Sequence, residues 1–443
     1  MSEAFDLILT GGTVAAPGGL AETDVGMRDG RIAMIGDLSG GPAAETIDCS
    51  GLHVLPGVID SQVHFREPGL EHKEDFGTGT AAAALGGVTA VFEMPNTSPA
   101  TITAADLADK AQRAKGRAWV DMAFFVGATA ENAESLGALE RLPSCAGVKM
   151  FMGSSTGDLL VADDAGVAQV LANGSRRMAV HCEDERRLRD RFTIVEGGAE
   201  PSQHADWRDV DSAVIATRRL LALAEGVKRR VHVLHVSTAD EMMLLRDHRD
   251  LATVEVTPQH LTLAAPECYE LLETFAQMNP PIRDDSHRRA LWQAVAAGIV
   301  DCVGSDHAPH TREEKKRPYP NTPSGMPGVQ TLVPVMLEHV ARGRISLERF
   351  IDLTSAGPAR IYGIAGRGRI AVGYGAHLTV VDLKHQRMIT NQWIASRCGW
   401  TPFDGMRCTG WPMITVVGGR VVMREGQLLG EPSGEAVRFM ECL

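Results

Sequence analysis

Potential metal-binding side chains stand at the ends of several hydrophobic segments in the middle of the chain. His64 closes "GVIDSQVH", Lys149 lies within "AGVKMFMG", and His181 follows "RMAV". His235 closes "VHVLH", and Asp306 follows "DCVGS". Imidazole nitrogens and carboxylate oxygens are ligands that proteins use for divalent metals. If the hydrophobic segments are neighbouring strands, these residues meet at one edge and predict a metal site there.

The segment "GVIDSQVHFREPG", residues 57–69, departs from a common metal-binding pattern at one position. A strand that ends in Asp-x-His-x-His often holds a catalytic metal, and Gln62 stands here in place of the first histidine. Because strand residues alternate between two faces, Asp60, Gln62 and His64 point the same way, with Asp60 one step deeper. The amide oxygen of glutamine is a poorer zinc ligand than an imidazole nitrogen, so we expect a weakened first metal position.

Three arrangements of the metal site stay open. It holds two metals, with Gln62 as a weak ligand or a bystander, or it holds none. In the third arrangement it holds one metal, on Lys149, His181 and His235. We expect at least one zinc-like ion, because a chain that had abandoned the metal would have little reason to keep these residues together.

Strand alternation also selects between neighbouring candidates. His232 and His235 are three residues apart, so only one of them faces the centre, and His235 is nearer the strand end. We therefore expect His232 to be structural or to face the helices. Asp306 and His307 face opposite ways, and Asp306 is the better ligand candidate.

The middle of the chain alternates strand-like and helix-like segments. Most strand candidates are continuous apolar runs, typical of parallel strands buried on both faces. There are eight, at residues 53–64, 88–96, 119–127, 146–153, 177–184, 230–238, 252–261 and 299–310. In "RDVDSAVIATRRLLALAEG" the apolar residues share one helical face, and Gly226 is the expected C-terminal stop. The pattern predicts an α/β fold, a (β/α)8 TIM-like barrel with its chemistry at the carboxyl ends of the strands.

The two ends of the chain differ from the middle. "DVGMRDGRIAMIG" has apolar runs on either side of Asp29-Gly30, which is a strong hairpin signal, and the last zone contains similar short strands. We predict that residues 1–54 and 366–443 form one small composite β-sandwich domain. Residues 55–365 are then the metal-dependent barrel domain.

Length and charge limit the class of protein. The 443 residues suit a barrel with an accessory domain. The net charge of −12 argues against a nucleic acid or a membrane as partner, since both bind basic surfaces. The N-terminus has no signal-peptide pattern, and the eight cysteines form no C-x-x-C pair. We expect reduced thiols in a cytoplasmic protein.

Eight motifs lie along the chain in a specific combination: "VIDSQVHFREPGLEHKEDF", "MPNT", "GVKMFMGSSTGDLL", "HCEDE", "LHVST", "VTPQHLTL", "MNPPIR" and "GSDHAPHTREEK". Together they resemble the hydantoinase-like dihydroorotases of the amidohydrolase superfamily. The resemblance continues through "GRIAVGY" to "GWTPFDGM", nearly the full chain. It implies a metal-dependent barrel hydrolase with a composite β-sandwich. It also implies reversible cyclisation of N-carbamoyl-L-aspartate to L-dihydroorotate, a step of pyrimidine biosynthesis.

The resemblance implies a role for each candidate residue and one or two Zn²⁺ ions. The implied metal ligands are His64, Lys149, His181, His235 and Asp306, and Lys149 falls where a carboxylated lysine bridges two metals. Asp306 is also the implied catalytic residue, which shuttles the proton. The implied substrate-holding positions are Arg66, Asn96, Asn279 and His310. Barrels of this type are commonly dimers or tetramers, so we expect a homo-oligomer.

These residue types suit the hydrolysis of an amide at neutral pH. A bound divalent ion lowers the pKa of water to about 7 and polarises the carbonyl under attack. The Asp306 carboxylate can carry the proton to the leaving nitrogen. Arg66 can hold the unreactive carboxylate of a small-molecule substrate through two parallel hydrogen bonds, and Asn96 can add a third.

Two other functions stay open. A hydantoinase or allantoinase cleaves similar cyclic amides on the same scaffold, although a plain hydantoin offers Arg66 no carboxylate to hold. The other is a non-catalytic dihydroorotase-like scaffold for aspartate transcarbamoylase, and Gln62 is its main support. Residues 312–324 are expected to form an exposed loop near the site, which makes them a candidate lid.

Overall fold

The computed structural model describes residues 4–155, 157 and 159–442. Within this part of the chain, eight parallel strands pair in sequence order. They are β6 (Val58–Val63), β7 (Val88–Glu93), β8 (Asp121–Gly127), β9 (Cys145–Phe151), β10 (Met178–His181), β11 (Val231–Val233), β12 (Ala252–Val256) and β13 (Cys302–Val303). A parallel bridge between Val63 and His307 joins the end of β6 to the segment after β13. The sheet therefore nearly closes, and the predicted (β/α)8 barrel is confirmed.

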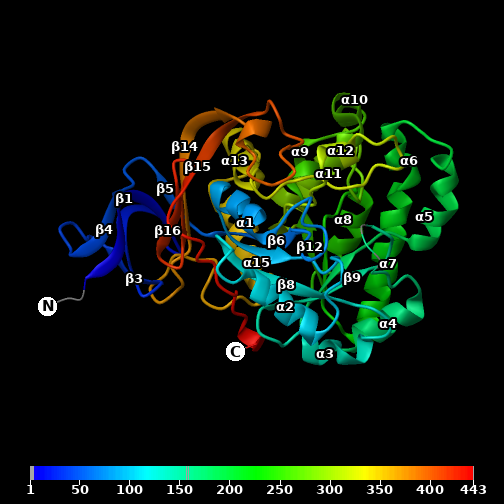
Figure 1. Cartoon of the computed structure of the whole chain (residues 1–443), viewed down its shortest axis with the longest axis horizontal. Helices are drawn as coiled ribbons and strands as arrows, with labels where there is room; N and C mark the ends of the chain where they lie inside the picture. Colours follow the sequence, from blue (N-terminus) through cyan, green and yellow to red (C-terminus); the bar gives the residue numbers. More distant parts are fainter. Residues whose placement is uncertain (1–3, 156, 158, 443) are drawn as a thin grey trace.

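Helices surround the barrel strands (Figure 1). The longer ones are α1 (Phe76–Leu85), α2 (Ala104–Ala114), α4 (Asp164–Ala172), α7 (Val210–Val227), α8 (Ala239–Arg246), α11 (Asp285–Ala296) and α13 (Leu332–Ala341). Shorter ones are α3 (Leu136–Leu139), α5 (Glu185–Arg191), α6 (His204–Trp207), α9 (Pro258–Thr262), α10 (Glu267–Leu272), α12 (Arg312–Lys315), α14 (Leu347–Ile351) and α15 (Gly357–Tyr362). Helix α12 falls within residues 312–324, so the expectation of an exposed loop is wrong there, and Lys315 is buried.

Helix α7 begins and ends at residues whose contacts can be traced to the sequence. The Asp209 side chain caps the start by accepting a hydrogen bond from the backbone N–H of Ser212, 3.0 Å away. The buried face includes Ala213, Leu220 and Ala224, as the periodicity predicts. The expected stop at Gly226 is wrong, because the helix continues to Val227. Lys228 then takes the left-handed conformation (φ 57°), and its N–H reaches the carbonyls of Ala224 and Glu225.

Both ends of the chain contribute strands to a second sheet, which is mixed. In the described residues its strands are β1 (Phe5–Ala16), β2 (Gly19–Arg28), β3 (Arg31–Gly36), β4 (Ala43–Asp48), β5 (His53–Pro56), β14 (Leu378–Met388), β15 (Arg407–Val417), β16 (Arg420–Arg424) and β17 (Gln427–Leu428). Strand β14 runs antiparallel to β5, so blue N-terminal and orange C-terminal strands lie side by side in Figure 1. The hairpin at Asp29-Gly30 is confirmed, since both residues have positive φ and Arg28 pairs with Arg31.

The bottom of the barrel is closed by the last residues of the chain. Ala436 forms a parallel bridge with Met122 of β8, and Phe439 forms an antiparallel bridge with Ile364. Phe439 is buried with Phe92 and other side chains of the barrel interior. The division of the chain at residues 54 and 366 stays a prediction, and this tail packs against the barrel.

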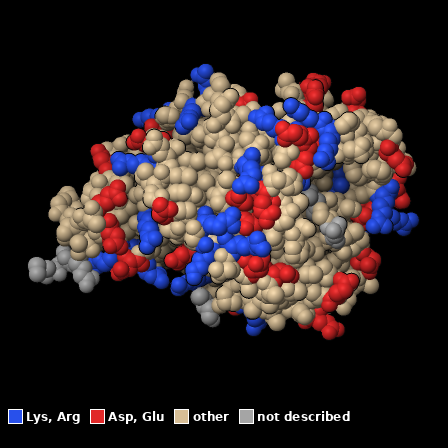
Figure 2. Space-filling model, viewed as in Figure 1, with Lys and Arg blue, Asp and Glu red and all other residues tan. Residues whose placement is uncertain are grey.

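Three further observations bear on the expected surroundings of the protein. All eight cysteines are free thiols, and all but Cys442 are buried. Acidic and basic side chains are interspersed over the face shown in Figure 2. Among the helices of the described chain, none combines the length and apolar character needed to cross a bilayer.

Candidate active site

The predicted metal and substrate residues meet around one cavity at the carboxyl ends of the barrel strands. Its lining comprises Gln62, His64, Arg66, Asn96, Lys149, Phe151, Ser155, His181, His235, Asn279, Asp306, Ala308, Ser324 and Gly325. Eight predicted site residues are in this group, together with Gln62. His310 is not, because it lies behind Arg66. These side chains lie together because they stand at the ends of neighbouring strands, as the sequence indicates.

Asp306 contacts two residues at the end of the first barrel strand, Gln62 and His64. Its Oδ1 atom accepts a hydrogen bond from Nε2 of Gln62, 3.0 Å away, and lies 3.3 Å from Nε2 of His64. Burial lowers the pKa of His64 to about 4, so its ring is neutral at neutral pH. When Nδ1 of His64 donates to Oδ1 of Asn96, 2.8 Å away, the lone pair of Nε2 faces Asp306. Two acceptors facing each other are suited to a cation between them.

The deeper partner Asp60 supports this arrangement. Its Oδ1 accepts hydrogen bonds from the backbone N–H of Ser305, at 2.9 Å, and of Gln62, at 3.3 Å. These contacts fix the chain on either side of the cavity, because Ser305 directly precedes Asp306. Burial alone would raise the pKa of Asp306, but its contact with His64 and the nearby charge of Lys149 hold that pKa below its usual value.

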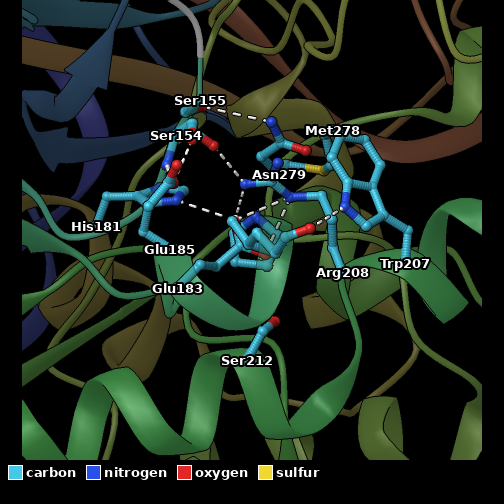
Figure 3. A network of polar contacts seen from close by, with 12 residues as sticks. Ser154, Ser155, His181, Glu183, Glu185, Trp207, Arg208, Ser212, Met278 and Asn279 are labelled. Carbon is cyan, nitrogen blue, oxygen red and sulfur yellow. Dashed lines mark hydrogen bonds and ion pairs between the residues drawn. The ribbon is translucent and has the colours of Figure 1, made fainter. Parts of the chain in front are cut away.

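His181 and His235 form a second close pair at the cavity, and a buried carboxylate, Glu183, contacts His181 (Figure 3). Nε2 of His181 lies 3.0 Å from Oε2 of Glu183, which can only accept, so this nitrogen carries the proton. Nδ1 of His181 then presents a lone pair toward Nε2 of His235, 3.1 Å away. His235 donates through Nε2 and leaves Nδ1 with a lone pair, and Nδ1 is buried without a hydrogen-bond partner. A carboxylate that orients a histidine in this way is typical of metal-binding histidines.

Arg208 holds Glu183 from the other side. Its Nε atom donates to Oε1 of Glu183 at 3.1 Å, and its Nη2 donates to the carbonyl of Ser154 at 2.7 Å. Burial alone would raise the pKa of Glu183, but Arg208 and His181 keep it below its usual value. Sequence reasoning missed both Glu183 and Arg208. The available signal was spacing, since Glu183 follows His181 by two residues and therefore shares its face.

Lys149 projects from β9 into the cavity and is buried. Its Nζ atom lies over the Phe151 ring, 4.5 Å from the ring centroid. Burial lowers the pKa of Lys149 to about 7, although the charge of Asp306 acts in the opposite direction. A substantial fraction of neutral amine is therefore present at neutral pH, and a neutral amine is the form that reacts with carbon dioxide.

Arg66 is 1% exposed and keeps part of its guanidinium free. Its Nε donates to the carbonyl of Pro309 at 3.1 Å, and Nη1 has no hydrogen-bond partner. Lys73 donates to Nδ1 of His310 at 3.2 Å, so Nε2 of His310 carries the proton and donates to the carbonyl of Ser324 at 3.0 Å. The contact of 3.3 Å between Nη2 of Arg66 and Nε2 of His310 therefore joins two donors. His310 therefore packs against Arg66 but does not accept a hydrogen bond from it.

Asn279 lines both the cavity described above, which we call the mouth, and a second, larger cavity. Its Nδ2 lies 3.5 Å from Oγ of Ser155, and its Oδ1 lies 3.0 Å from Nε2 of His204. The second cavity has a volume of about 470 Å³ and shares Ser155, Asn279 and Ser324 with the mouth. Its apolar lining includes Leu188, Phe192, Trp207 and Tyr319.

Three of the site residues have strained backbone conformations. Arg66, His235 and Asp306 have φ values of 65°, 37° and 44°, in the left-handed region that side chains disfavour. Such strain costs roughly 1–3 kcal/mol per residue and persists only where the surrounding structure enforces it. The three side chains are therefore held toward the cavity at a cost in stability.

The possible ligand atoms at the mouth fit a divalent metal. His64 and His181 present lone pairs, and the buried Oε1 of Gln62 and Nδ1 of His235 lack hydrogen-bond partners. Lys149 and Asp306 complete the set that could hold it. In the described chain, a group of three His, Cys, Asp or Glu ligand atoms within 4.8 Å of one another occurs elsewhere in the barrel. The mouth donors instead form two close pairs.

Comparisons with known proteins give the family of the chain. Residues 53–422 match the model of the Amidohydrolase family. A dihydroorotase from Methanothermobacter thermautotrophicus is 36% identical over 411 residues, which is 92% of this chain and 92% of that protein. A dihydroorotase from Halobacterium salinarum is 37% identical over 391 residues, which is 87% of this chain and 89% of that protein.

Solved structures show the same architecture. The L-hydantoinase (dihydropyrimidinase) from Arthrobacter aurescens superposes with a TM-score of 0.92 at 29% identity, covering 98% of this chain and 100% of that chain. The dihydropyrimidinase from Brevibacillus agri gives a TM-score of 0.89 at 29% identity, covering 97% of each chain. The chain therefore belongs to the amidohydrolase family, and it is a hydrolase that acts on cyclic amides.

Proposed function

We propose that this chain is a dihydroorotase, which interconverts N-carbamoyl-L-aspartate and L-dihydroorotate. The observation that carries the proposal is the buried guanidinium of Arg66, which lines the cavity and has an unpartnered Nη1. A buried guanidinium nitrogen without an acceptor is costly, and the carboxylate of dihydroorotate would supply an acceptor for Nη1. The dihydroorotases with 36% and 37% identity support the same substrate.

The side chains at the mouth divide the work of the reaction. Arg66 binds the unreactive carboxylate, and Asn96 and Asn279 hold the remaining polar groups of the ring. Asp306 takes a proton at its carboxylate and passes it to the ring nitrogen that leaves. Glu183 and Arg208 keep His181 in one tautomer and orientation. Holding the reacting groups in this geometry supplies a large part of the rate.

The proposal includes a divalent ion, one or two Zn²⁺, held by His64, Lys149, His181, His235 and Asp306. When bound, such an ion lowers the pKa of water and polarises the carbonyl of the amide. The lowered pKa of Lys149, about 7, supports carboxylation of this residue, because the neutral amine is the reactive form. Carboxylation would also replace a cation in the cavity with an anion, which suits a metal site.

The substrate is tested by ring-opening assays after reconstitution with zinc and bicarbonate. Dihydroorotate, hydantoin and allantoin are compared by ultraviolet absorbance, and we expect turnover of dihydroorotate. Turnover of the uncharged rings alone would overturn the proposal.

The role of Arg66 is tested with Arg66→Gln. We expect KM for dihydroorotate to rise about 10- to 100-fold, as for the loss of hydrogen bonds to a charged group. Arg186→Gln is the control, because the Arg186 side chain is 92% exposed. An unchanged KM in Arg66→Gln would show that this arginine does not hold the substrate.

A hydantoinase or dihydropyrimidinase is the second candidate, and a specific observation favours it. The apolar cavity of about 470 Å³ beside the mouth could receive a bulky ring substituent, which dihydroorotate lacks. The same assay, repeated with an aryl-substituted hydantoin, separates the two candidates.

We also propose a cytoplasmic homo-oligomer, a dimer or tetramer, that acts on a small molecule. The eight free thiols support a reducing compartment. Light scattering of the purified protein would measure the number of subunits.

A further inference from the structure

Three polar side chains meet in the barrel interior, deeper than the mouth. His232 of β11, Glu255 of β12 and Cys302 of β13 lie on consecutive strands, and each is 0% exposed. His232 precedes His235 by three residues on the same segment. Of the two expectations for His232, a structural role or a place on the helix side, the second is wrong, because its ring lies against Glu255, Cys302 and Tyr362 inside the barrel.

The spacing of the three ligand atoms matches the edges of a tetrahedron around zinc. Nε2 of His232 lies 3.6 Å from Oε2 of Glu255 and 3.6 Å from Sγ of Cys302, and Sγ lies 3.7 Å from Oε2. Bond lengths of about 2.0–2.1 Å to nitrogen or oxygen and 2.3 Å to sulfur, at the tetrahedral angle, give edges of roughly 3.3–3.6 Å. The Oγ atom of Ser61 donates a hydrogen bond to Oε2 of Glu255 at 2.8 Å and lies 4.0 Å from Sγ of Cys302.

Among the described residues, Glu255 makes no ion pair with a lysine or an arginine, and Ser61 donates a hydrogen bond to one of its two oxygens, Oε2. In this part of the chain, the ion-pair contact of Glu255 is with His232, and Oε1 of Glu255 has no hydrogen-bond partner. The Tyr362 ring packs against the His232 ring, with 5.6 Å between the ring centroids. A carboxylate buried in this way is costly unless a cation compensates it.

We propose that His232, Glu255 and Cys302 bind a divalent, zinc-like ion, separate from the metal of the mouth. The Cys302 thiol loses its proton to solvent when the metal binds, because coordination strongly favours the thiolate. One thiolate and one carboxylate balance the two positive charges of the ion, so the site is neutral in a buried place. Nδ1 of His232 lies 2.8 Å from Oγ1 of Thr253, a contact that fixes the ring for coordination through Nε2.

Cobalt substitution tests this site separately from the mouth. The protein is produced with Co²⁺ in place of zinc, because the enclosed site must be filled as the chain folds. A cobalt–thiolate bond gives a charge-transfer band in the near ultraviolet, and the mouth cavity has no cysteine in its lining. We expect this band in the wild-type protein and in His181→Asn, which impairs the mouth.

Matched cysteine variants identify the ligand. Cys302→Ser should lose the charge-transfer band, while Cys182→Ser, at another buried thiol, should keep it. A wild-type protein without the band, or a band that persists in Cys302→Ser, overturns the proposal. If Cys302→Ser fails to fold, zinc-edge X-ray absorption of the wild-type protein decides. A sulfur neighbour at about 2.3 Å supports the site, and its absence rejects it.

Discussion

At the scale of single residues, Asp306 is the group on which the proposed reaction depends most. It contacts His64 and Gln62 and lies among side chains that lower its pKa. We expect Asp306→Asn to reduce kcat by at least 100-fold, the lower end of what a positioned proton-transfer group contributes. The far-ultraviolet circular dichroism should be unchanged.

The same variant separates the enzyme from a non-catalytic scaffold. Asp247→Asn serves as control, since that side chain is 63% exposed. If neither the wild-type protein nor Asp306→Asn opens any cyclic amide after metal reconstitution, the scaffold reading is favoured.

We expect Gln62 to set how strongly the first metal position is occupied. Its Nε2 donates to Asp306, and its Oε1 is buried without a partner. Replacing it by histidine supplies an imidazole nitrogen in place of an amide oxygen, a better zinc ligand. We expect Gln62→His to raise zinc affinity by at least the roughly tenfold that supporting contacts to a ligand are worth. Competition with a chelator, followed by metal analysis, measures the change. Equal metal retention in both proteins would mean that position 62 is a bystander.

The residues of the mouth could be predicted because their types are rare in buried strands and their positions repeat. Lys149, His181 and His235 each stand near the end of an apolar run, and strand alternation chose His235 over His232 for the mouth. Alternation alone did not place His232 correctly, because a chain that leaves the strand after Val233 no longer follows a period of two. The pairing of Glu183 with Arg208 depends on a contact across 25 residues, for which the sequence has no periodic signal.

At the scale of elements, the turn after β10 contributes Glu183, which contacts His181 at the end of the strand. Glu183 receives Arg208, which follows α6, and so joins the end of β10 to a helix that is separate in sequence. We expect Glu183→Gln to lower metal affinity about 10- to 100-fold, because His181 loses the carboxylate that orients it. The melting temperature should fall as well, since Arg208 is left buried with a weaker partner.

Isothermal titration with zinc, after removal of bound metal, measures this effect. Glu196→Gln is the matched control, because Glu196 is exposed. A normal zinc affinity in Glu183→Gln would show that this carboxylate is structural.

The strand count could be predicted from the apolar runs, whereas the strand lengths could not. The last candidate, residues 299–310, contains only the two-residue strand β13, and the rest is loop. We attribute the short strand to a tertiary contact. The Asp60 carboxylate accepts a hydrogen bond from the backbone N–H of Ser305 and so holds the chain at the mouth. The end of α7 was also missed, because Lys228, an exposed non-glycine residue, takes the left-handed cap that glycine usually occupies.

At the scale of the whole molecule, the chain ends are joined to each other and to the barrel. One N-terminal strand, β5, pairs with β14, and a joint sheet of both ends could be predicted from the similar short strands there. The closure of the barrel bottom by residues 436–439 could not, because that segment is too short to show a period. Phe439 is 1% exposed, with its ring centroid 5.6 Å from that of Phe92 and 4.7 Å from the guanidinium carbon of Arg176.

We expect Phe439→Ala to lower the free energy of unfolding by about 3–5 kcal/mol, the usual cost of removing a buried aromatic ring. Denaturant unfolding followed by fluorescence measures it, with Met440→Ala as control because Met440 is 64% exposed. Activity per folded molecule should be unchanged, since Phe439 lies at the opposite end of the barrel from the mouth. A loss below about 1 kcal/mol would mean that the tail lies on the barrel without supporting it, since most surface substitutions fall within ±0.5 kcal/mol.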